Sequence, residues 1–237
     1  MQDKSLLMWL EAPLQSWGGD SKFGNRDTLK FPTRSGIAGL LLCAMGASGE
    51  QIELLAKLKL SRQTVISYRK QPTSDKESSA PLLCDFHMVG SGYDKNHAWQ
   101  KMMIPKTAEG KAAVGGGSKM TYRHYLQDAC FAVVLTTSEN LAEQFMQALQ
   151  MPVFDIYLGK KCCVPTDFIP RGVFASEDEA KAEAAKIAHA KARTEEFWVI
   201  DGEHPKLGEP FSVNDVPVRF GEAKIYSDRR ATIIRSI

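Results

Sequence analysis

Short apolar runs along the chain predict its strands. Residues 5–11 read SLLMWLE and residues 129–136 read ACFAVVLT, and both runs are typical of buried strands. Residues 62–70, RQTVISYRK, alternate between polar and apolar side chains and indicate another strand. Residues 81–89, PLLCDFHMV, are expected to form a fourth. The pattern therefore places four strands before the C-terminal third of the chain.

Helical patterns separate these strands. Ser35 is expected to cap a helix over residues 36–44, and a second short helix is expected near residues 50–58. Ser138 is expected to cap a third helix. In that helix apolar residues recur at four-residue steps and mark one buried face: Leu141, Phe145 and Leu149.

A fourth helix is rich in alanine. Ser176 and Glu179 form a capping box, which predicts that this helix begins there and continues to about residue 193. Ile187 is its one large apolar residue. The helix is therefore expected to lie on the protein surface.

The order of these elements suggests a fold class. With a short apolar segment at 154–158, it reads strand, helix, strand, strand, insertion, strand, helix, strand. This order is compatible with an α+β, ferredoxin-like β-α-β-β-α-β core, although other α+β folds would also allow it. Closing strands are expected at 197–200 and within 216–234. The predicted organisation is a core made of residues 1–89 and 121–237, with residues 90–120 as a glycine-rich insertion and a variable C-terminal region.

Composition narrows the class of protein. The chain has 237 residues, 43% hydrophobic and 24% charged, which is ordinary for a globular protein and excludes a disordered or coiled-coil chain. No run approaches the roughly 18 apolar residues of a membrane span, and no secretory signal is expected. Five cysteines without a CxxC pair favour a reducing cytoplasm over a disulfide framework. The net charge of +2 means that any nucleic-acid role depends on local charge.

Catalytic and metal-binding motifs are weak. The chain has no Walker loop, GxSxG or HExxH sequence. A zinc site built from Cys84, His87, Cys130 and the pair at 162–163 is conceivable, but the cysteines at 43, 84 and 130 are better interpreted as small core residues. Metal-free RNA cleavage needs a general base and a general acid, which could come from four residues around the insertion: His87, Lys119, Tyr122 and His124. Binding or packing roles for these four are favoured.

Three segments carry features of RNA binding. Residues 17–36 interleave four basic residues with three aromatic ones and end at a predicted helix N-terminus, where amides, hydroxyls and a guanidinium could hold a phosphate. The alternative is a polar loop with an ordinary cap. Residues 95–125 hold six basic residues against one acidic residue, which suits a polyanion or a solvated loop. Residues 157–162, YLGKKC, join a glycine to two lysines, and alone this signal is weak.

Together these segments resemble the CasD family, the handle-binding backbone subunit of type I-E CRISPR Cascade. The resemblance spans residues 5–175 and is carried by PLQSWG, Arg26 and FPTRSG near the N-terminus, by DFHMV, by YRHYLQDA, and by YLGKKC. The chain departs from the family in a longer insertion containing GGGS, in Lys160 and Lys161 where two arginines are common, and in the alanine-rich helix.

The resemblance implies a fold, partners and site residues. It implies a ferredoxin-like, RRM-type core of the repeat-associated mysterious protein (RAMP) superfamily, with residues 90–120 as a protruding thumb. It implies binding of the crRNA 5′ handle, capping of the backbone filament, and contacts with the repeated backbone subunit and the large subunit, with target DNA reached through the crRNA. It implies no catalysis, cofactor, metal or membrane, although the type I-C homologue is a metal-independent endoribonuclease that processes pre-crRNA. The residues expected to bind RNA are Trp17, Arg26, Thr33, Arg34, Ser35, Gly36, Lys119, Met120, Arg123, Tyr157, Leu158, Gly159, Lys160, Lys161 and Cys162.

A third interpretation belongs to a different class. A nearly neutral chain with local basic loops is also compatible with a protein–protein scaffold that binds no RNA. RNA that copurifies with the assembled complex would distinguish the two. The sequence therefore leaves three hypotheses: a handle-binding subunit, a ribonuclease and a scaffold.

Overall fold

The structure is a computed structural model of the whole chain. It describes residues 2–19, 21, 24–70, 82–90, 97, 98, 102, 106, 107, 109–111 and 118–235. Most of the expected insertion at 90–120 lies outside these described residues, as do Lys22 and Phe23. The description below concerns the described residues alone.

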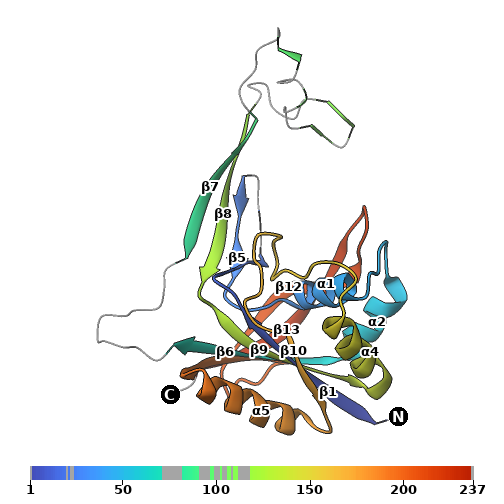
Figure 1. Cartoon of the computed structure of the whole chain (residues 1–237), viewed down its shortest axis with the longest axis vertical. Helices are drawn as coiled ribbons and strands as arrows, with labels where there is room; N and C mark the ends of the chain where they lie inside the picture. The colour runs from blue at the N-terminus through green and yellow to red at the C-terminus, as the bar shows by residue number, and fades with distance from the viewer. Residues whose placement is uncertain are drawn as a thin grey trace, which may run out of the picture.

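A seven-stranded sheet forms the centre of the protein (Figure 1). Each neighbouring pair of its strands is antiparallel. In spatial order the strands are β10 (Pro170–Phe174), β1 (Asp3–Glu11), β9 (Cys130–Ser138), β6 (Arg62–Lys70), β11 (Arg193–Asp201), β13 (Ile225–Arg235) and β12 (Glu209–Arg219). The four strands β10-β1-β9-β6 come from the first 174 residues, and the C-terminal strands extend the sheet beyond β6.

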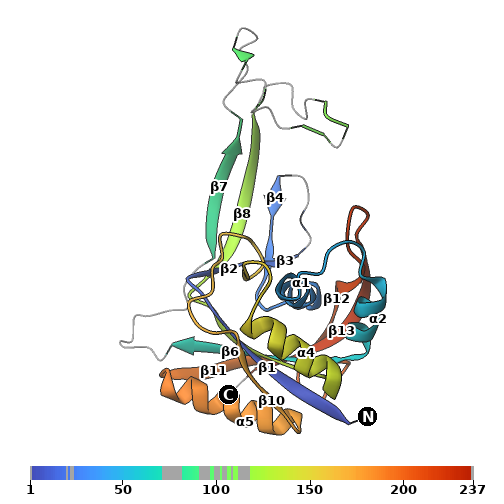
Figure 2. The same cartoon turned by 45° about the vertical axis from the view of Figure 1, so that its right-hand side comes forward.

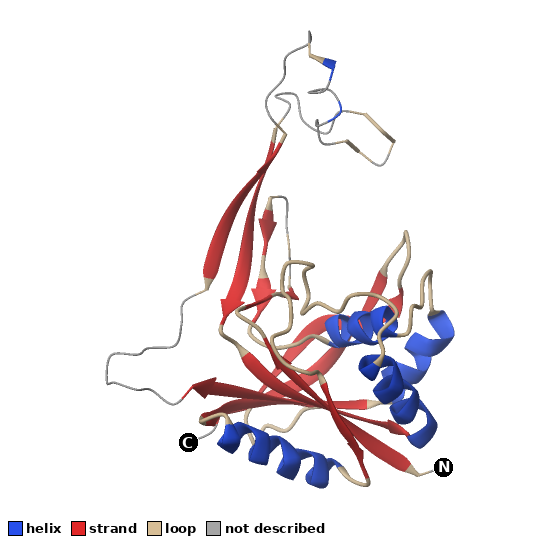
Figure 3. Cartoon of the chain, viewed as in Figure 1, coloured by secondary structure: helices blue, strands red, loops and turns tan. Residues whose placement is uncertain are grey.

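Helices cover both faces of this sheet (Figure 3). On one face, α1 (Arg34–Ala44), α2 (Ile52–Leu60) and α4 (Glu139–Gln150) pack in one apolar cluster with Leu6 and Met8 of β1. On the other face, α5 (Glu177–Ala190) packs in a second cluster with Leu7 and Trp9 of the same strand. This double cover explains why β1 is a continuous apolar run. Among the described residues no helix is long and apolar enough to cross a membrane.

The alanine-rich helix α5 is more buried than its sequence suggested. Ala180, Ala184 and Ala188 are buried and face the sheet at four-residue steps. Because alanine side chains are small, the helix can lie close to the strands. No large apolar side chains are then needed to fill the space between the helix and the sheet. The helix therefore lies at the surface, as expected, and buries one alanine face against the sheet. Its predicted cap is confirmed, because the Ser176 hydroxyl accepts from the Glu179 N–H at 3.2 Å.

A second, smaller group of strands stands beside the central sheet (Figure 2). The strands β7 (Leu83–Val89) and β8 (Lys119–Gln127) form an antiparallel two-stranded ribbon that extends away from the sheet. The polar segment 13–34 contributes four two-residue strands: β2 (Leu14–Gln15), β3 (Trp17–Gly18), β4 (Asn25–Arg26) and β5 (Thr28–Leu29). Of these, β2 and β4 pair with β8, and β3 pairs with β5.

Most predicted elements are confirmed, with three corrections. The predicted strand at 154–158 is wrong, because the strand that follows α4 is β10 at 170–174 and residue 158 instead pairs through its backbone with the loop at Ser16. The cap of α1 is Thr33 rather than Ser35. The Thr33 backbone is extended, and its hydroxyl accepts from the Gly36 N–H at 3.1 Å. The expected closing strand within 216–234 is split between β12 and β13 by a turn at Gly221.

Candidate nucleic-acid interface

Four segments that are distant in sequence meet around one pocket. They are the β3 loop, one side of α1 with its cap at Thr33, the loop at 157–159, and the turn between β12 and β13. The pocket has a volume of about 370 Å³, within the range of ligand sites. Its lining residues are Ser16, Trp17, Gly18, Thr33, Ser35, Gly36, Gly39, Leu40, Cys43, Tyr157, Gly159, Phe220, Lys224 and Tyr226. None of these residues is acidic, and Lys224 is the charged member of the set.

Trp17 and Gly36 form one wall of the pocket. A Cβ atom added to Gly36 would lie 2.7 Å from Cε3 of Trp17, so the indole packs directly on the α1 backbone. The backbone N–H of Trp17 donates to the Thr28 hydroxyl at 2.8 Å, and the Trp17 side chain is fully buried. Trp17 therefore shapes the pocket wall and does not offer the exposed stacking face that its sequence context suggested.

Gly159 allows the second loop to touch the first. Its φ is +93°, and a Cβ atom there would lie 1.6 Å from the carbonyl oxygen of Ser16. The Ser16 N–H donates to the Leu158 carbonyl at 3.2 Å. The buried Leu158 side chain anchors this loop in the core. The glycine in YLG is therefore required by a backbone-to-backbone approach, which places Tyr157 at the pocket.

A basic strip lies beside the pocket, on β8, β4 and the 157–162 loop. We use this name for Arg26, Arg123 and Lys160. Arg26 and Arg123 are register partners on β4 and β8. The Lys160 ammonium lies 4.3 Å from the centroid of the Tyr125 ring and donates to the His124 carbonyl at 3.4 Å. Burial, together with the nearby Arg123 charge, lowers the pKa of Lys160 below the usual lysine value.

The pocket and the basic strip are continuous. Ser16 lines the pocket, and its hydroxyl donates to the carbonyl of His124 at 3.1 Å, next to Arg123 in β8. Gly159 lines the pocket and directly precedes Lys160. The exposed Lys161 and Cys162 follow in the same loop, and the Cys162 thiol contacts the Tyr125 hydroxyl at 3.5 Å.

The β7–β8 ribbon presents an exposed apolar face. The rings of Phe86 and Tyr122 lie 5.3 Å apart, and the exposed fractions on this face are 52% for Phe86, 56% for Met88, 59% for Met120 and 51% for Tyr122. Lys119 begins β8 at the far end of the ribbon. Lys119 and Met120, both expected to bind RNA, therefore lie on the ribbon and do not line the pocket.

The four residues considered for RNA cleavage do not share a face of the ribbon. His87 pairs with Thr121, and Lys119 lies two residues earlier in β8, so these side chains point to one face. Tyr122 and His124 alternate to the opposite face. The His124 ring lies 3.0 Å from the Asn25 side-chain oxygen. This arrangement divides the four residues into two pairs, His87 with Lys119 and Tyr122 with His124.

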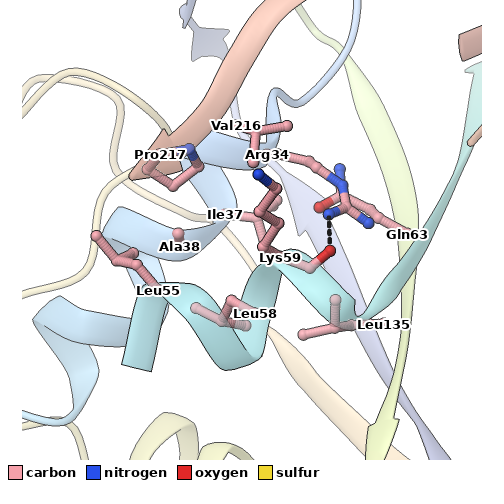
Figure 4. Close-up of a pocket in the computed structure, with 10 residues that line it drawn as sticks. All are labelled: Arg34, Ile37, Ala38, Leu55, Leu58, Lys59, Gln63, Leu135, Val216 and Pro217. Carbon is pink, nitrogen blue, oxygen red and sulfur yellow. Dashed lines mark hydrogen bonds between the residues drawn. The ribbon is translucent and has the colours of Figure 1, made fainter. Parts of the chain in front are cut away.

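Arg34 does not line the pocket, contrary to expectation. Only 9% of the residue is exposed, and it lines a separate, smaller pocket of about 20 Å³ between α1, α2 and β12 (Figure 4). Its Nη2 lies 2.6 Å from Asp201 and also donates to the Ser61 carbonyl, while Nη1 donates to the Lys59 carbonyl at 3.3 Å. The guanidinium is therefore engaged inside the protein and does not reach a phosphate at the surface.

Arg34 belongs to an interior ion cluster, which we define as Arg34, Asp201, Asp215 and Arg229. The Asp215 carboxylate accepts from the Arg34 backbone N–H at 2.8 Å and from Arg229 Nε at 2.7 Å. Arg229 Nη1 lies 2.6 Å from Asp201. Burial opposes charge on Arg229, but its bonds to the two carboxylates outweigh burial and raise its pKa. The cluster ties the start of α1 to β11, β12 and β13.

The conceivable zinc ligands are not gathered into a site. Cys130 is buried in β9, whereas Cys84 is exposed on the ribbon. Within the described ranges, no three His, Cys, Asp or Glu side chains are placed to hold a metal ion.

Sequence reasoning missed the contribution of the C-terminal turn. Phe220, Lys224 and Tyr226 line the pocket, although the resemblance ended near residue 175. The signal available was the run RFGEAKIY at 219–226, in which aromatic and basic residues flank a turn glycine. Nothing in that run alone predicts which loop it approaches.

Comparisons with known proteins agree with one another. The family described as CRISPR-associated protein (Cas_Cas5) matches residues 5–233. The CRISPR system Cascade subunit CasD of Escherichia coli (strain K12) is 29% identical over 181 residues, which cover 75% of this chain and 74% of that protein. A solved CRISPR RNA-guided surveillance complex contains a chain with a TM-score of 0.71 and 27% identity, covering 98% of this chain and 90% of its own length. A crystal structure of a Cas protein matches with a TM-score of 0.56 at 23% identity, over 98% and 95% of the two chains, and supports the fold alone.

Proposed function

Because this chain belongs to the Cas5 family of CRISPR-associated proteins, we propose that it is the CasD subunit of a type I-E Cascade, where it holds the crRNA 5′ handle and caps the backbone filament. The observation that carries this proposal is the continuity of an acid-free pocket with a basic strip. A single-stranded RNA can follow such a strip with its phosphates, while its unstacked bases reach a neighbouring pocket.

The residues proposed to contact RNA follow from this geometry. The strip supplies Arg26, Arg123 and Lys160, and the exposed Lys161 and Cys162 extend it. The predicted residues at the pocket are Thr33, Ser35, Gly36, Tyr157 and Gly159, with the buried Trp17 shaping its wall. Lys119 and Met120 would contact RNA or a neighbouring subunit from the ribbon. Arg34 and Leu158 support the site from the interior.

We also propose that the core is ferredoxin-like. Its support is the spatial order β10-β1-β9-β6, in which α1 and α2 connect β1 to β6 and α4 connects β9 to β10. The domain division is a core of 1–89 and 121–237 with a thumb at 90–120, for which the protruding β7–β8 ribbon would be the base.

In the assembled complex the thumb would reach the repeated backbone subunit, and the large subunit would dock elsewhere. The complex would act in the cytoplasm and meet target DNA through the crRNA.

The test is RNA content after assembly. Coexpression with the other subunits and a CRISPR array should yield a complex whose absorbance at 260 nm reveals RNA and whose bound strand, when sequenced, begins with the repeat. The double variant Arg123→Ala/Lys160→Ala should lower RNA content. A charge-matched control, Lys70→Ala/Lys186→Ala, removes two exposed lysines whose surface ion pairs contribute little. A complete complex without RNA would overturn the proposal and favour a protein–protein scaffold.

Ribonuclease activity is the alternative function. The ribbon places His87 and Lys119 opposite Tyr122 and His124, which supports a subunit without catalysis of its own. We expect no cleavage when the chain is incubated with its repeat hairpin without metal. Specific cutting that is lost in His87→Ala or Tyr122→Phe would establish the enzyme instead.

A further inference from the structure

We propose that the turn between β12 and β13 completes a pocket for one unstacked RNA nucleotide, with Phe220 and Tyr226 contacting its base and Lys224 its phosphate. This inference deepens the proposed function and rests on it, but it concerns residues outside the segments that suggested RNA binding. These three residues line the pocket together with one side of α1, from its cap at Thr33 to Cys43.

Contacts with Glu50 hold the turn that carries the aromatic wall, Phe220 and Tyr226, in place. The Phe220 N–H donates to the Glu50 carbonyl at 3.0 Å, and the Arg219 guanidinium lies 4.0 Å from the Glu50 carboxylate. The turn is thereby anchored on the connection between α1 and α2. The rings of Phe220 and Tyr226 pack edge to face with centroids 6.5 Å apart, and Tyr226 remains 37% exposed. A positioned, partly open aromatic pair is a suitable surface for a flat base.

The opposite wall is polar and carries no acid. Ser16, Thr33 and Ser35 line this wall with hydroxyl groups; that of Ser16 already donates to the His124 carbonyl and can only accept from a base edge or a ribose. The Thr33 hydroxyl already accepts from Gly36 and lies 3.3 Å from the Ser35 hydroxyl. Lys224 is exposed at the pocket and adds a positive charge. An aromatic side, a hydroxyl side and a cation together match a nucleotide.

The size and the surroundings favour RNA over a protein side chain. A volume of about 370 Å³ is large enough for one base and its sugar. The pocket is continuous with the basic strip through Ser16 and Gly159, so a strand that follows the strip arrives at the opening. A peptide from a neighbouring subunit is the rival occupant, and the experiment below separates it.

The experiment measures how base removal and side-chain removal combine. The full-length chain is titrated against a labelled single-stranded RNA with the sequence of the 5′ segment recovered from the complex, and against a series in which each base in turn is absent. Wild-type protein should lose about tenfold in affinity at one position, which corresponds to a stack within the usual range of about 1–3 kcal/mol. Phe220→Ala/Tyr226→Ala should bind intact RNA about tenfold more weakly and should lose nothing further at that position. Ile225→Ala, between the two and outside the pocket lining, is the matched control and should behave as wild type.

Each other outcome has a defined meaning. Wild-type affinity that is the same for intact RNA and for every abasic RNA would overturn the nucleotide pocket while leaving RNA binding in place. A double variant that binds RNA as wild type does but fails to join the complex would also overturn it, because a protein partner would then occupy the pocket. Wild-type chain that binds none of the RNAs would overturn the proposed function itself. Thermal unfolding of each variant verifies that it is folded.

Discussion

Arg34 provides a direct test of the difference between a structural and an RNA-binding arginine. The change Arg34→Met keeps most of the aliphatic volume and removes the guanidinium. Because that group lies in the interior ion cluster, we expect the change to lower the free energy of unfolding and not to remove a direct RNA contact.

The magnitude follows from the partners that are left behind. The carbonyls of Lys59 and Ser61 lose their donor, and such orphaned groups cost about 1–3 kcal/mol each. The Asp201 carboxylate still pairs with Arg229 at 2.6 Å and still accepts from the Gln63 N–H at 2.9 Å, so its negative charge remains compensated. The expected loss is therefore about 3 kcal/mol, near the lower end of the range for breaking a buried ion pair.

The assay is urea unfolding, followed by circular dichroism, alongside RNA titration. With a slope of about 3 kcal/mol per molar urea, the unfolding midpoint of Arg34→Met should fall by about 1 M. Lys161→Met is the matched control, since it removes one positive charge from an exposed site. It should leave the midpoint almost unchanged and weaken RNA binding. An unchanged midpoint for Arg34→Met, together with a large loss of RNA affinity, would refute this account and restore Arg34 as a phosphate contact.

Three further changes test other parts of the structure. Gly159→Ala should weaken RNA binding and lower the thermal unfolding temperature, because its Cβ would meet the Ser16 carbonyl at 1.6 Å; wild-type behaviour would contradict the close approach. The lowered pKa of Lys160 means that it loses its proton at a lower pH than an ordinary lysine, so as pH rises toward the usual lysine pKa of 10.5 RNA affinity should fall less in Lys160→Arg than in wild type, and identical pH profiles would count against its role. Ala184→Leu should destabilise by about 1–3 kcal/mol through overpacking against the sheet, whereas the exposed Ala185→Leu should not, and equal effects would argue that α5 is loosely packed.

The main strands and helices could be predicted because their patterns are local. The run at residues 5–11 is apolar because helices cover both faces of β1, and the recurrence of Leu141, Phe145 and Leu149 follows from one buried face of α4. The short strands between residues 13 and 34 could not be predicted. A two-residue strand has no measurable period, and each of these is defined by a partner elsewhere in space.

The same reasoning explains what was found and missed at the site. Gly159 and the neighbouring lysines could be recognised as candidate site residues from the sequence. A glycine permits a close backbone approach and a lysine carries a positive charge, and both properties follow from residue type alone. The orientation of Arg34 is not visible, since its partners Asp215 and Asp201 lie 181 and 167 residues away. Likewise Phe220 reaches the pocket only because β12 and β13 extend the central sheet past α1.

The interior ion cluster connects the stability of the protein to the shape of the pocket. Arg34 begins α1, one side of which forms a wall of the pocket, and the Arg34 backbone N–H donates to Asp215 of β12. Arg229 of β13 binds the same carboxylate, and the turn that joins these two strands carries Phe220 on the other wall. Two walls contributed by distant parts of the chain are thus fixed to one set of buried charges. A pocket held in this way needs little ordering when a base enters, so the binding free energy is not spent on rearranging its walls.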